Sequence, residues 1–315
     1  MDHQSEQLER RRSLIAALDA MREGDLSQTR LARLSDLSRE GARIVARVWP
    51  TLPEDLRVAI VRRCEELTEE RIDLDFRRAL GIALEDESPV VRQLAIGALW
   101  EDDSTALFER LRLIVQDDPS PDVRAAAAAA LGKYAQNAAI GALEGHLADE
   151  LRAELVRAAR DADTPYALQR RALESLGPFA DDTAIAAAIV DAFDSGDQGL
   201  RCSAIYAMGL SRNPRWLPSI LGELESDEPE VRFEAARSAG LLASADALPL
   251  LIDAAHDEDA EVRHTAINAI GQIGGRGAVR ALERLAEDAG EADLELIEAA
   301  IEDVNTLIEP FQPSP

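Results

Sequence analysis

Hydrophobic and small residues recur along the chain in a phrase that begins with arginine. The phrase reads RQLAIGALW (92–100), RAAAAAALG (124–132), RCSAIYAMG (201–209), RFEAARSAG (232–240) and RHTAINAIG (263–271), and QRRALESLG (169–177) is a copy with Gln169 in the arginine's place. Successive copies end 32, 45, 32, 31 and 31 residues apart. A period of this length indicates a chain built from internal repeats.

The spacing inside the phrase predicts a helix. Alanine stands three residues after the first position in all six copies, and apolar residues stand four and seven residues after it, on the same helical face. Proline three residues before the arginine (Pro89, Pro121 and Pro229) suits a helix start, and we expect the closing glycine to mark the helix end. A second amphipathic stretch lies between phrases, and no segment alternates as a strand does. Each repeat therefore predicts two antiparallel helices.

A helix pair of about 31 residues whose second helix reads (D)xxPxVRxxAaxALG resembles the HEAT-repeat family, in the short bacterial and archaeal form shared with phycobilisome-lyase-like proteins. The resemblance covers about residues 50–290. It implies an all-α fold, a right-handed α-α superhelix of about seven to eight helix pairs. The chain departs from the pattern at Gln169, at Trp100 in place of glycine, and in one repeat lengthened by about thirteen residues around 138–163. That insertion either extends a helix or adds one, and whether it acts as a hinge stays open.

The pattern predicts three parts along the chain. Residues 1–36 form an N-terminal helical cap, 37–290 form the repeat solenoid, and 291–315 form an acidic capping helix with a frayed tail at 311–315. Four apolar residues of the first part share one helical face, and we expect them to be buried: Leu14, Ala17, Leu18 and Met21.

Composition narrows the function. The formal net charge is −26, which opposes non-specific binding to nucleic acid over most of the surface. The two cysteines, Cys64 and Cys202, have no paired spacing, so we expect neither a disulfide framework nor a zinc site. The first twenty residues lack the apolar stretch of a signal peptide, and no apolar run exceeds seven residues. We therefore expect a soluble cytoplasmic protein without a membrane span.

No motif indicates catalysis. The four histidines (His3, His146, His256 and His264) form no ligand pair at helical spacing, and the glycines of 271–277 follow a predicted helix instead of a strand. We expect no catalytic residues, no metal and no cofactor, and hence a protein that is not an enzyme. An enzyme similar to the lyase-like or DNA-glycosylase-like relatives of the fold is the least favoured alternative.

The arginines that open the phrases are expected to be structural. A planar guanidinium suits two-point contact with a carboxylate, and acidic residues such as Asp86, Asp118, Asp227 and Asp257 stand in the turns. We expect each arginine to pair with a carboxylate of its own or a neighbouring turn; the alternative is an exposed basic stripe. The arginines are Arg57, Arg92, Arg124, Arg201, Arg232 and Arg263.

Two surfaces are candidates for partner binding. In HEAT-like solenoids the second helices line the concave wall, and the residues one, two and five positions after the arginine should face outward there. Aromatic and arginine side chains at these positions in the last three copies are typical of binding hot spots. The predicted strip consists of Tyr206, Phe233, Arg237, His264 and Asn268. The alternative is partial burial between repeats, especially for Phe233.

The second surface is basic. Residues 10–63 hold twelve arginines against seven acidic residues, a net charge of +5, so the remainder carries −31. Arg39, Arg43 and Arg47 recur every four residues, opposite an apolar face. Such a stripe could bind phosphates or an acidic protein, or it could contact the protein's own acidic surface or a symmetry mate.

The favoured function is a non-enzymatic scaffold or adaptor that holds a protein partner on its concave face. The acidic surface would select a basic partner by charge. The alternative is a nucleic-acid- or ribosome-associated module that uses the arginine stripe. The sequence names neither the partner nor the pathway, and it leaves the oligomeric state open.

Overall fold

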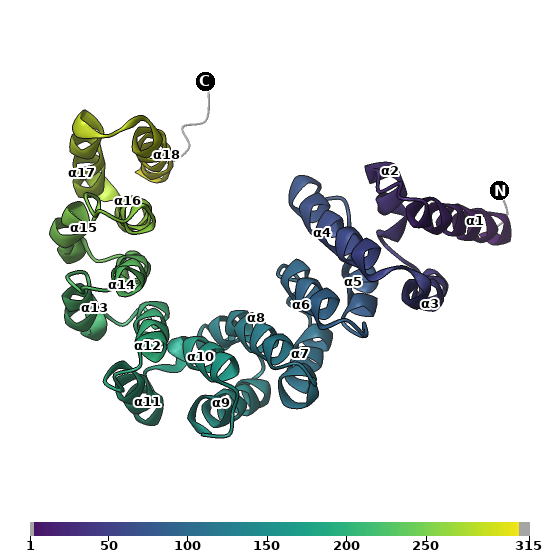
Figure 1. The fold of residues 1–315 in the computed structure, drawn as a ribbon, viewed down its shortest axis with the longest axis horizontal. Helices are drawn as coiled ribbons and strands as arrows, with labels where there is room; N and C mark the ends of the chain where they lie inside the picture. The colour runs from purple at the N-terminus through teal and green to yellow at the C-terminus, as the bar shows by residue number, and fades with distance from the viewer. Residues whose placement is uncertain (1–2, 309–315) are drawn as a thin grey trace. The chain divides into compact units, whose positions relative to one another are not determined.

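The computed structural model describes residues 3–308, and every regular element in this range is a helix. None of the described helices is both long and apolar enough to span a bilayer. The chain divides into two compact units, residues 1–134 and 135–315, called here the N-terminal and C-terminal units. The all-α helical-repeat fold that the sequence predicts is confirmed (Figure 1).

The N-terminal unit contains the predicted first helix and the first helix pairs. Helix α1 packs on α2 and α3, and its residues Leu14, Ala17, Leu18 and Met21 are buried as expected. Beyond it, α3 packs on α5 and α4 packs on α6, so corresponding helices of successive pairs are neighbours. The helices are α1 (His3–Arg22), α2 (Gln28–Leu31), α3 (Arg39–Val48), α4 (Glu54–Glu70), α5 (Arg77–Ala83), α6 (Pro89–Ala98), α7 (Thr105–Asp117) and α8 (Pro121–Ala139), whose end lies in the next unit.

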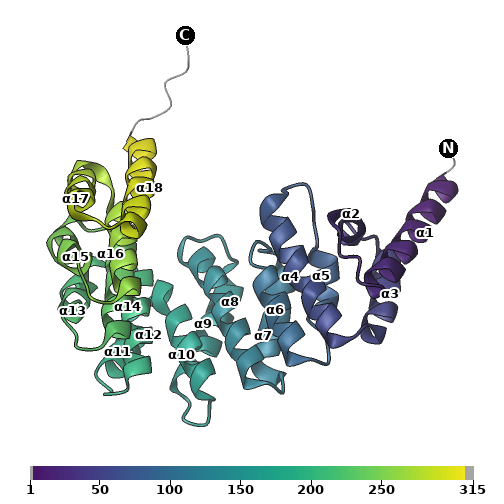
Figure 2. The same cartoon turned by 45° about the horizontal axis from the view of Figure 1, so that its top comes forward.

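The C-terminal unit is a stack of two layers. Its helices are α9 (Gly145–Arg160), α10 (Tyr166–Ser175), α11 (Thr183–Phe193), α12 (Gln198–Leu210), α13 (Leu217–Glu223), α14 (Pro229–Leu242), α15 (Leu248–Ala254), α16 (Ala260–Ile273), α17 (Gly275–Asp288) and α18 (Glu291–Ile308). The second helix of each pair contacts the next second helix, so that α10, α12, α14, α16 and α18 form one layer. Within this unit that layer lies on the inner side of the curve, and the first helices lie outside it (Figures 1 and 2). We call these the inner and outer layers.

The lengthened repeat adds no helix. Helix α8 runs on to Ala139, and α9 has 16 residues, whereas the first helices α13 and α15 have 7 each. The extra residues therefore lengthen existing helices, which settles one alternative left open by the sequence. The division into caps at 1–36 and 291–315 stays a prediction, and the expected frayed tail at 311–315 lies outside the described residues.

The spacing of small residues that recurs in every copy explains how the helices approach one another. The alanine three residues after the phrase start has an exposed fraction of 0% in all six copies: Ala95, Ala127, Ala172, Ala204, Ala235 and Ala266. The predicted helix starts at Pro89, Pro121 and Pro229 are confirmed. A buried alanine face lets neighbouring backbones come close without side-chain entropy loss.

Of the closing glycines, only Gly177 follows a helix end, directly after the Leu176 cap of α10. The other closing glycines lie inside helices, so the expectation is wrong for them. Gly209 and Gly240 lie inside α12 and α14, which continue to Leu210 and Leu242. A Cβ atom on Gly209 would lie 2.8 Å from Cα of Ser238, and one on Gly240 would lie 2.9 Å from Cα of Ala269. The glycine is required because the next inner helix packs directly on its backbone.

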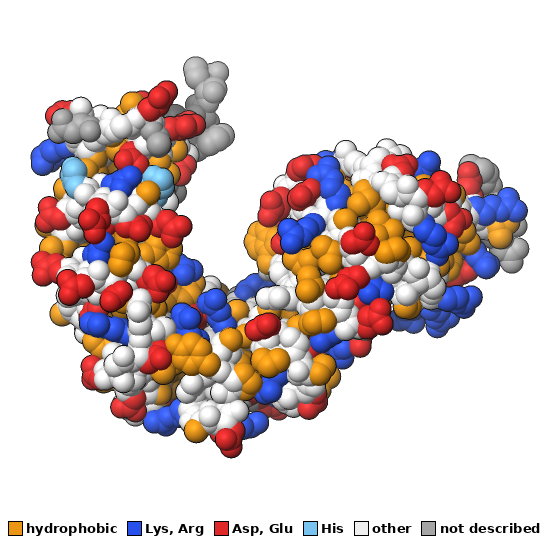
Figure 3. Space-filling model, in the orientation of Figure 1, with side chains coloured by type: hydrophobic (Ala, Val, Ile, Leu, Met, Phe, Trp, Pro, Cys, Tyr) orange, Lys and Arg blue, Asp and Glu red, His pale blue; other side chains and the backbone are white. Residues whose placement is uncertain are grey.

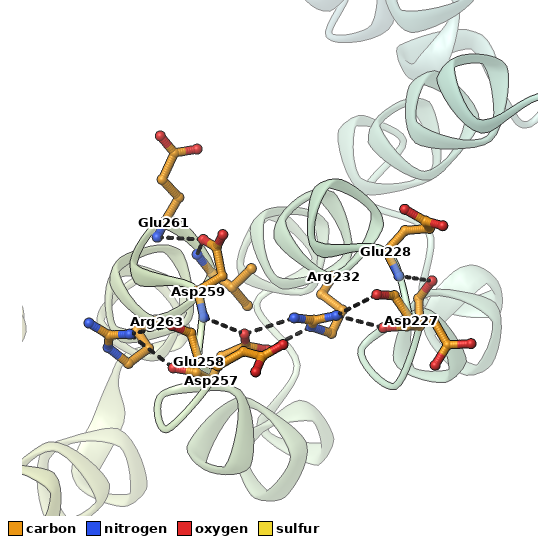
Figure 4. A network of polar contacts seen from close by, with 10 residues as sticks. Asp227, Glu228, Arg232, Asp257, Glu258, Asp259, Glu261 and Arg263 are labelled. Carbon is orange, nitrogen blue, oxygen red and sulfur yellow. Dashed lines mark hydrogen bonds and ion pairs between the residues drawn. The ribbon is translucent and has the colours of Figure 1, made fainter.

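Most of the phrase arginines join their own repeat to the next one. Arg92 donates from Nε and Nη2 to the Asp118 carboxylate, at 2.8 Å each. Arg232 contacts Asp257 in the same way at 2.7 and 2.9 Å, and its Nη1 donates to the carbonyl groups of Ser226 and Asp227 (Figure 4). The contact between Arg92 and Asp118 is shielded from solvent, because the two side chains are only 9% and 6% exposed. The guanidinium thus bonds its own turn and the following turn together.

The structural role expected for these arginines is largely confirmed. Arg57 pairs with Asp86 at 3.1 Å, and Arg263 approaches Asp293 at 3.4 Å. Arg201 also pairs with a carboxylate, that of Glu223 at the end of α13, at 2.6 Å. Arg124 differs from the expectation, because its Nε donates to the Val115 carbonyl at 2.7 Å.

Candidate partner-binding site

The predicted strip lies on the inner layer of the C-terminal unit. Tyr206 on α12 and Phe233 on α14 are half-buried, and Arg237 on α14 is exposed. The Arg237 guanidinium carbon lies 3.8 Å from the centre of the Tyr206 ring, a close cation–π stack between neighbouring helices. Burial raises the pKa of the Tyr206 phenol. The structure therefore brings these two predicted residues together.

The other end of the strip is arranged differently. His264 on α16 is half-buried, and its Nε2 lies 2.9 Å from Oδ1 of Asp293 on α18. Asn268 is exposed one turn further along α16. His264 thus has an intramolecular partner on the next helix, away from the Tyr206–Arg237 stack. Phe233 is half-buried, which agrees with the alternative that the sequence left open for this residue.

A polar cluster that the sequence analysis missed adjoins this stack. The Arg170 Nε donates to Ser203 Oγ at 3.0 Å, and that hydroxyl donates to Glu174 at 2.8 Å. The second Glu174 oxygen accepts from Arg171 at 2.7 Å. Arg170, Arg171 and Glu174 lie on α10 and Ser203 lies on α12, so the cluster joins two inner helices.

Glu234 on α14 is the remaining member of the cluster. Its side chain is 14% exposed, and its Oε1 lies 3.4 Å from the Arg237 Nη1. Burial raises the pKa of this carboxyl to about 7, and the positive charges of Arg237, Arg171 and Arg170 oppose the shift only in part. A carboxyl that titrates near neutral pH is a feature typical of functional sites.

One signal in the sequence could have identified the cluster. The predicted strip takes positions one, two and five only from copies that begin with arginine. The same offsets from Gln169 give Arg170, Arg171 and Glu174. The cluster and the stack therefore occupy the same three positions in the copies at 169, 201 and 232, one repeat earlier than the predicted strip.

The arginine stripe lies on α3 of the N-terminal unit. Arg39, Arg43 and Arg47 are exposed, and the structure contains no hydrogen bond or ion pair of their side chains with any residue in 3–308. The opposite face of α3 is covered, with Gly41 and Val45 buried. Basic side chains gather at this helix in Figure 3.

The described residues offer little to a metal or a nucleophilic mechanism. No group of three or more His, Cys, Asp or Glu side chains in the described part of the chain is placed to hold a metal ion. Cys64 and Cys202 are both buried and unpaired. Burial raises the pKa of the Cys64 thiol to about 12 and that of Cys202 to about 11, so neither is activated as a thiolate.

Stacked helix pairs, joined by a recurring arginine–carboxylate contact, define an α-helical repeat protein. Residues 78–162 and 217–302, together more than half of the chain, match the family described as HEAT repeats. The chain therefore belongs to the HEAT-repeat family. The match does not distinguish the phycobilisome-lyase-like form within it. No curated protein matches the chain.

Several solved structures are similar to the chain at low identity. YibA of Escherichia coli is 16% identical over 92% of this chain and 96% of its own, with a TM-score of 0.40. Human deoxyhypusine hydroxylase, solved with glycerol, is 17% identical over 84% of this chain and 96% of its own, with a TM-score of 0.37. An engineered protein is 17% identical over 91% of this chain and 88% of its own, with a TM-score of 0.40.

The expectation that the chain is not an enzyme is corrected here. The finding against that expectation is the hydroxylase among these structures, which is an enzyme. The likeness concerns the fold and assigns no reaction to this chain.

Proposed function

We propose that the protein is a scaffold that binds a protein partner on the inner layer of its C-terminal unit. The observation that carries this proposal is the Tyr206–Arg237 stack, which is half-exposed beside Phe233 on a wall of closely packed helices. Tyrosine and arginine dominate binding energy at protein interfaces, and side chains held by packing lose little entropy on binding.

The charges around the stack favour a basic partner. Glu261 is exposed near the start of α16, and acidic side chains surround hydrophobic ones over α14 and α16 in Figure 3. Complementary charge at a rim speeds association and rejects acidic competitors. The partner that fits is a protein with a basic segment and apolar side chains able to pack on Tyr206 and Phe233.

Partner capture with matched variants tests the proposal. Tyr206→Ala and Phe233→Ala should each reduce recovery of the partner from nuclease-treated lysate at least tenfold, which corresponds to a loss of about 1.4 kcal/mol. The control is Phe193→Ala, because Phe193 also carries an arginine over its ring (Arg201, 5.6 Å) but belongs to the outer helix α11. The proposal would be refuted if Tyr206→Ala and Phe233→Ala recovered as much partner as the Phe193→Ala control.

The arginine stripe supports a second candidate, binding to the phosphate backbone of nucleic acid. The supporting observation is that Arg39, Arg43 and Arg47 are exposed and unpaired within residues 3–308, whereas most phrase arginines are bonded. Arg30 of the same unit, which pairs with Asp25 at 3.1 Å, provides the control. The triple change to glutamate should abolish binding of a labelled RNA that Arg30→Glu leaves intact, and the affinity should fall with salt with a logarithmic slope of about −2 to −3. A slope near zero would exclude this candidate.

A further inference from the structure

Glu234 is more weakly compensated than Glu174 and Asp257, two other shielded carboxylates of the C-terminal unit. Both oxygens of Glu174 accept short hydrogen bonds, at 2.8 and 2.7 Å, and both oxygens of Asp257 do the same at 2.7 and 2.9 Å. Glu234 is 14% exposed, close to the 10% of Asp257. Within residues 3–308 its only charge partner is Arg237, at 3.4 Å from one oxygen.

The surrounding charges do not supply the missing contact. Arg237 is committed to the Tyr206 ring, and its side chain is 43% exposed. From α10, Arg170 and Arg171 bond Ser203 and Glu174, while Glu174 itself adds a second negative charge. From α12, the neighbours are the phenol of Tyr206 and the thiol of Cys202, and Glu230 lies one turn earlier on α14. Buried charges in proteins are normally paired, so an exception requires an explanation.

We propose that Glu234 is the anionic anchor for a lysine or arginine side chain of the partner. The proposal rests on the proposed function and specifies the chemistry that the inner layer recognises. Glu234 keeps a small exposed fraction through which a cation can reach its free oxygen. The half-buried Phe233 ring on the same wall adds an aromatic surface over which a cation is favoured, whereas the Tyr206 ring already carries Arg237. The raised pKa of Glu234 agrees with a carboxylate whose counter-charge is external.

The test uses the full-length protein and a defined probe, the peptide tetra-arginine, at physiological ionic strength. Calorimetric affinities are compared for the wild type, Glu234→Gln and Glu230→Gln. The last variant is the control because it removes the same charge from an exposed site on the same helix. The carboxyl ¹³C resonance of Glu234 is followed in parallel. We expect Glu234→Gln to weaken binding at least tenfold and Glu230→Gln less than threefold, with the Glu234 resonance moving toward its ionised position as peptide is added.

Three results would overturn the anchor. They are equal weakening by both variants, which indicates general attraction to an acidic surface, an unchanged Glu234 resonance, and no binding of the peptide. None of these results affects the capture experiment with Tyr206→Ala and Phe233→Ala. The partner-binding proposal therefore stands or fails separately. Near-ultraviolet circular dichroism of Glu234→Gln checks that the variant retains its packing.

Discussion

Replacing Glu234 with glutamine should stabilise the protein at alkaline pH. Burial raises the pKa of this carboxyl from 4.5 to about 7, so the folded state holds the proton more tightly than the unfolded chain. The contribution to stability is fully present below the unfolded pKa and is lost as the pH rises through the folded pKa. One pKa unit corresponds to about 1.4 kcal/mol, so the wild type loses about 3 kcal/mol between acidic pH and pH 8. Glutamine has nearly the same shape and no charge, so the variant avoids this loss.

Urea unfolding followed by circular dichroism measures the effect. At about pH 8, Glu234→Gln should exceed the wild type in free energy of unfolding by about 3 kcal/mol, and near pH 4.5 the two should be nearly equal. Glu230→Gln, at an exposed site on the same helix, should change stability by less than about 0.5 kcal/mol at either pH. If Glu234→Gln is no more stable than the wild type at pH 8, the carboxylate is compensated within the fold and the reasoning is refuted.

Three further predictions concern the joints between repeats. Gly209→Ala should destabilise the protein by about 1–3 kcal/mol, because the new Cβ would meet the Ser238 backbone. The control is Gly222→Ala, whose Cβ would have no neighbouring atom within 4 Å and which should be neutral or stabilising by up to about 1 kcal/mol. Thermal unfolding compares the two variants. Asp257→Ala should lower the free energy of unfolding in urea by about 3–5 kcal/mol, because it leaves the shielded Arg232 without its carboxylate partner. A loss below about 1 kcal/mol would show that the Arg232–Asp257 contact is dispensable. The hydrogen bonds from Arg232 lower the pKa of Asp257, so this stabilisation is present above the unfolded pKa of 3.8 and is lost as the pH falls toward the folded pKa; Asp257→Asn should flatten the acid limb of the stability curve.

The repeat period made the fold predictable. Alanine three residues after each phrase start has one structural meaning in all copies, namely a buried contact between neighbouring helices. The helix starts followed from proline in the same way. Glycine was less informative, because the same residue suits a helix end and a close helix crossing. Only the distance from Gly209 to Ser238 on the next helix decides between them.

The candidate site was partly predictable for a related reason. The predicted offsets place Tyr206 and Arg237 on neighbouring inner helices, where the two side chains stack, and their role in binding stays a prediction. The copy that supplies Arg170, Arg171 and Glu174 begins with Gln169, so a pattern defined by its leading arginine does not include it. The weak pairing of Glu234 depends on where the Arg237 side chain turns. Residue type and spacing do not fix that orientation.

The close glycine contacts between inner helices recur with the repeat period, so the protein can be lengthened or shortened by whole repeats. Removal of residues 232–262, one period of 31, would place Gly209 opposite Ala269, which differs from its present neighbour Ser238 by a hydroxyl group. Arg201 would keep Glu223, because that pair lies on the retained side of the cut. Duplication of the same segment would place Gly240 of the first copy opposite Ser238 of the second, a contact equivalent to the existing one between Gly209 and Ser238. Unequal recombination between copies can therefore lengthen or shorten the inner layer in evolution without requiring a new interface. An insertion of any other length would have to be absorbed inside a repeat, as in α8 and α9.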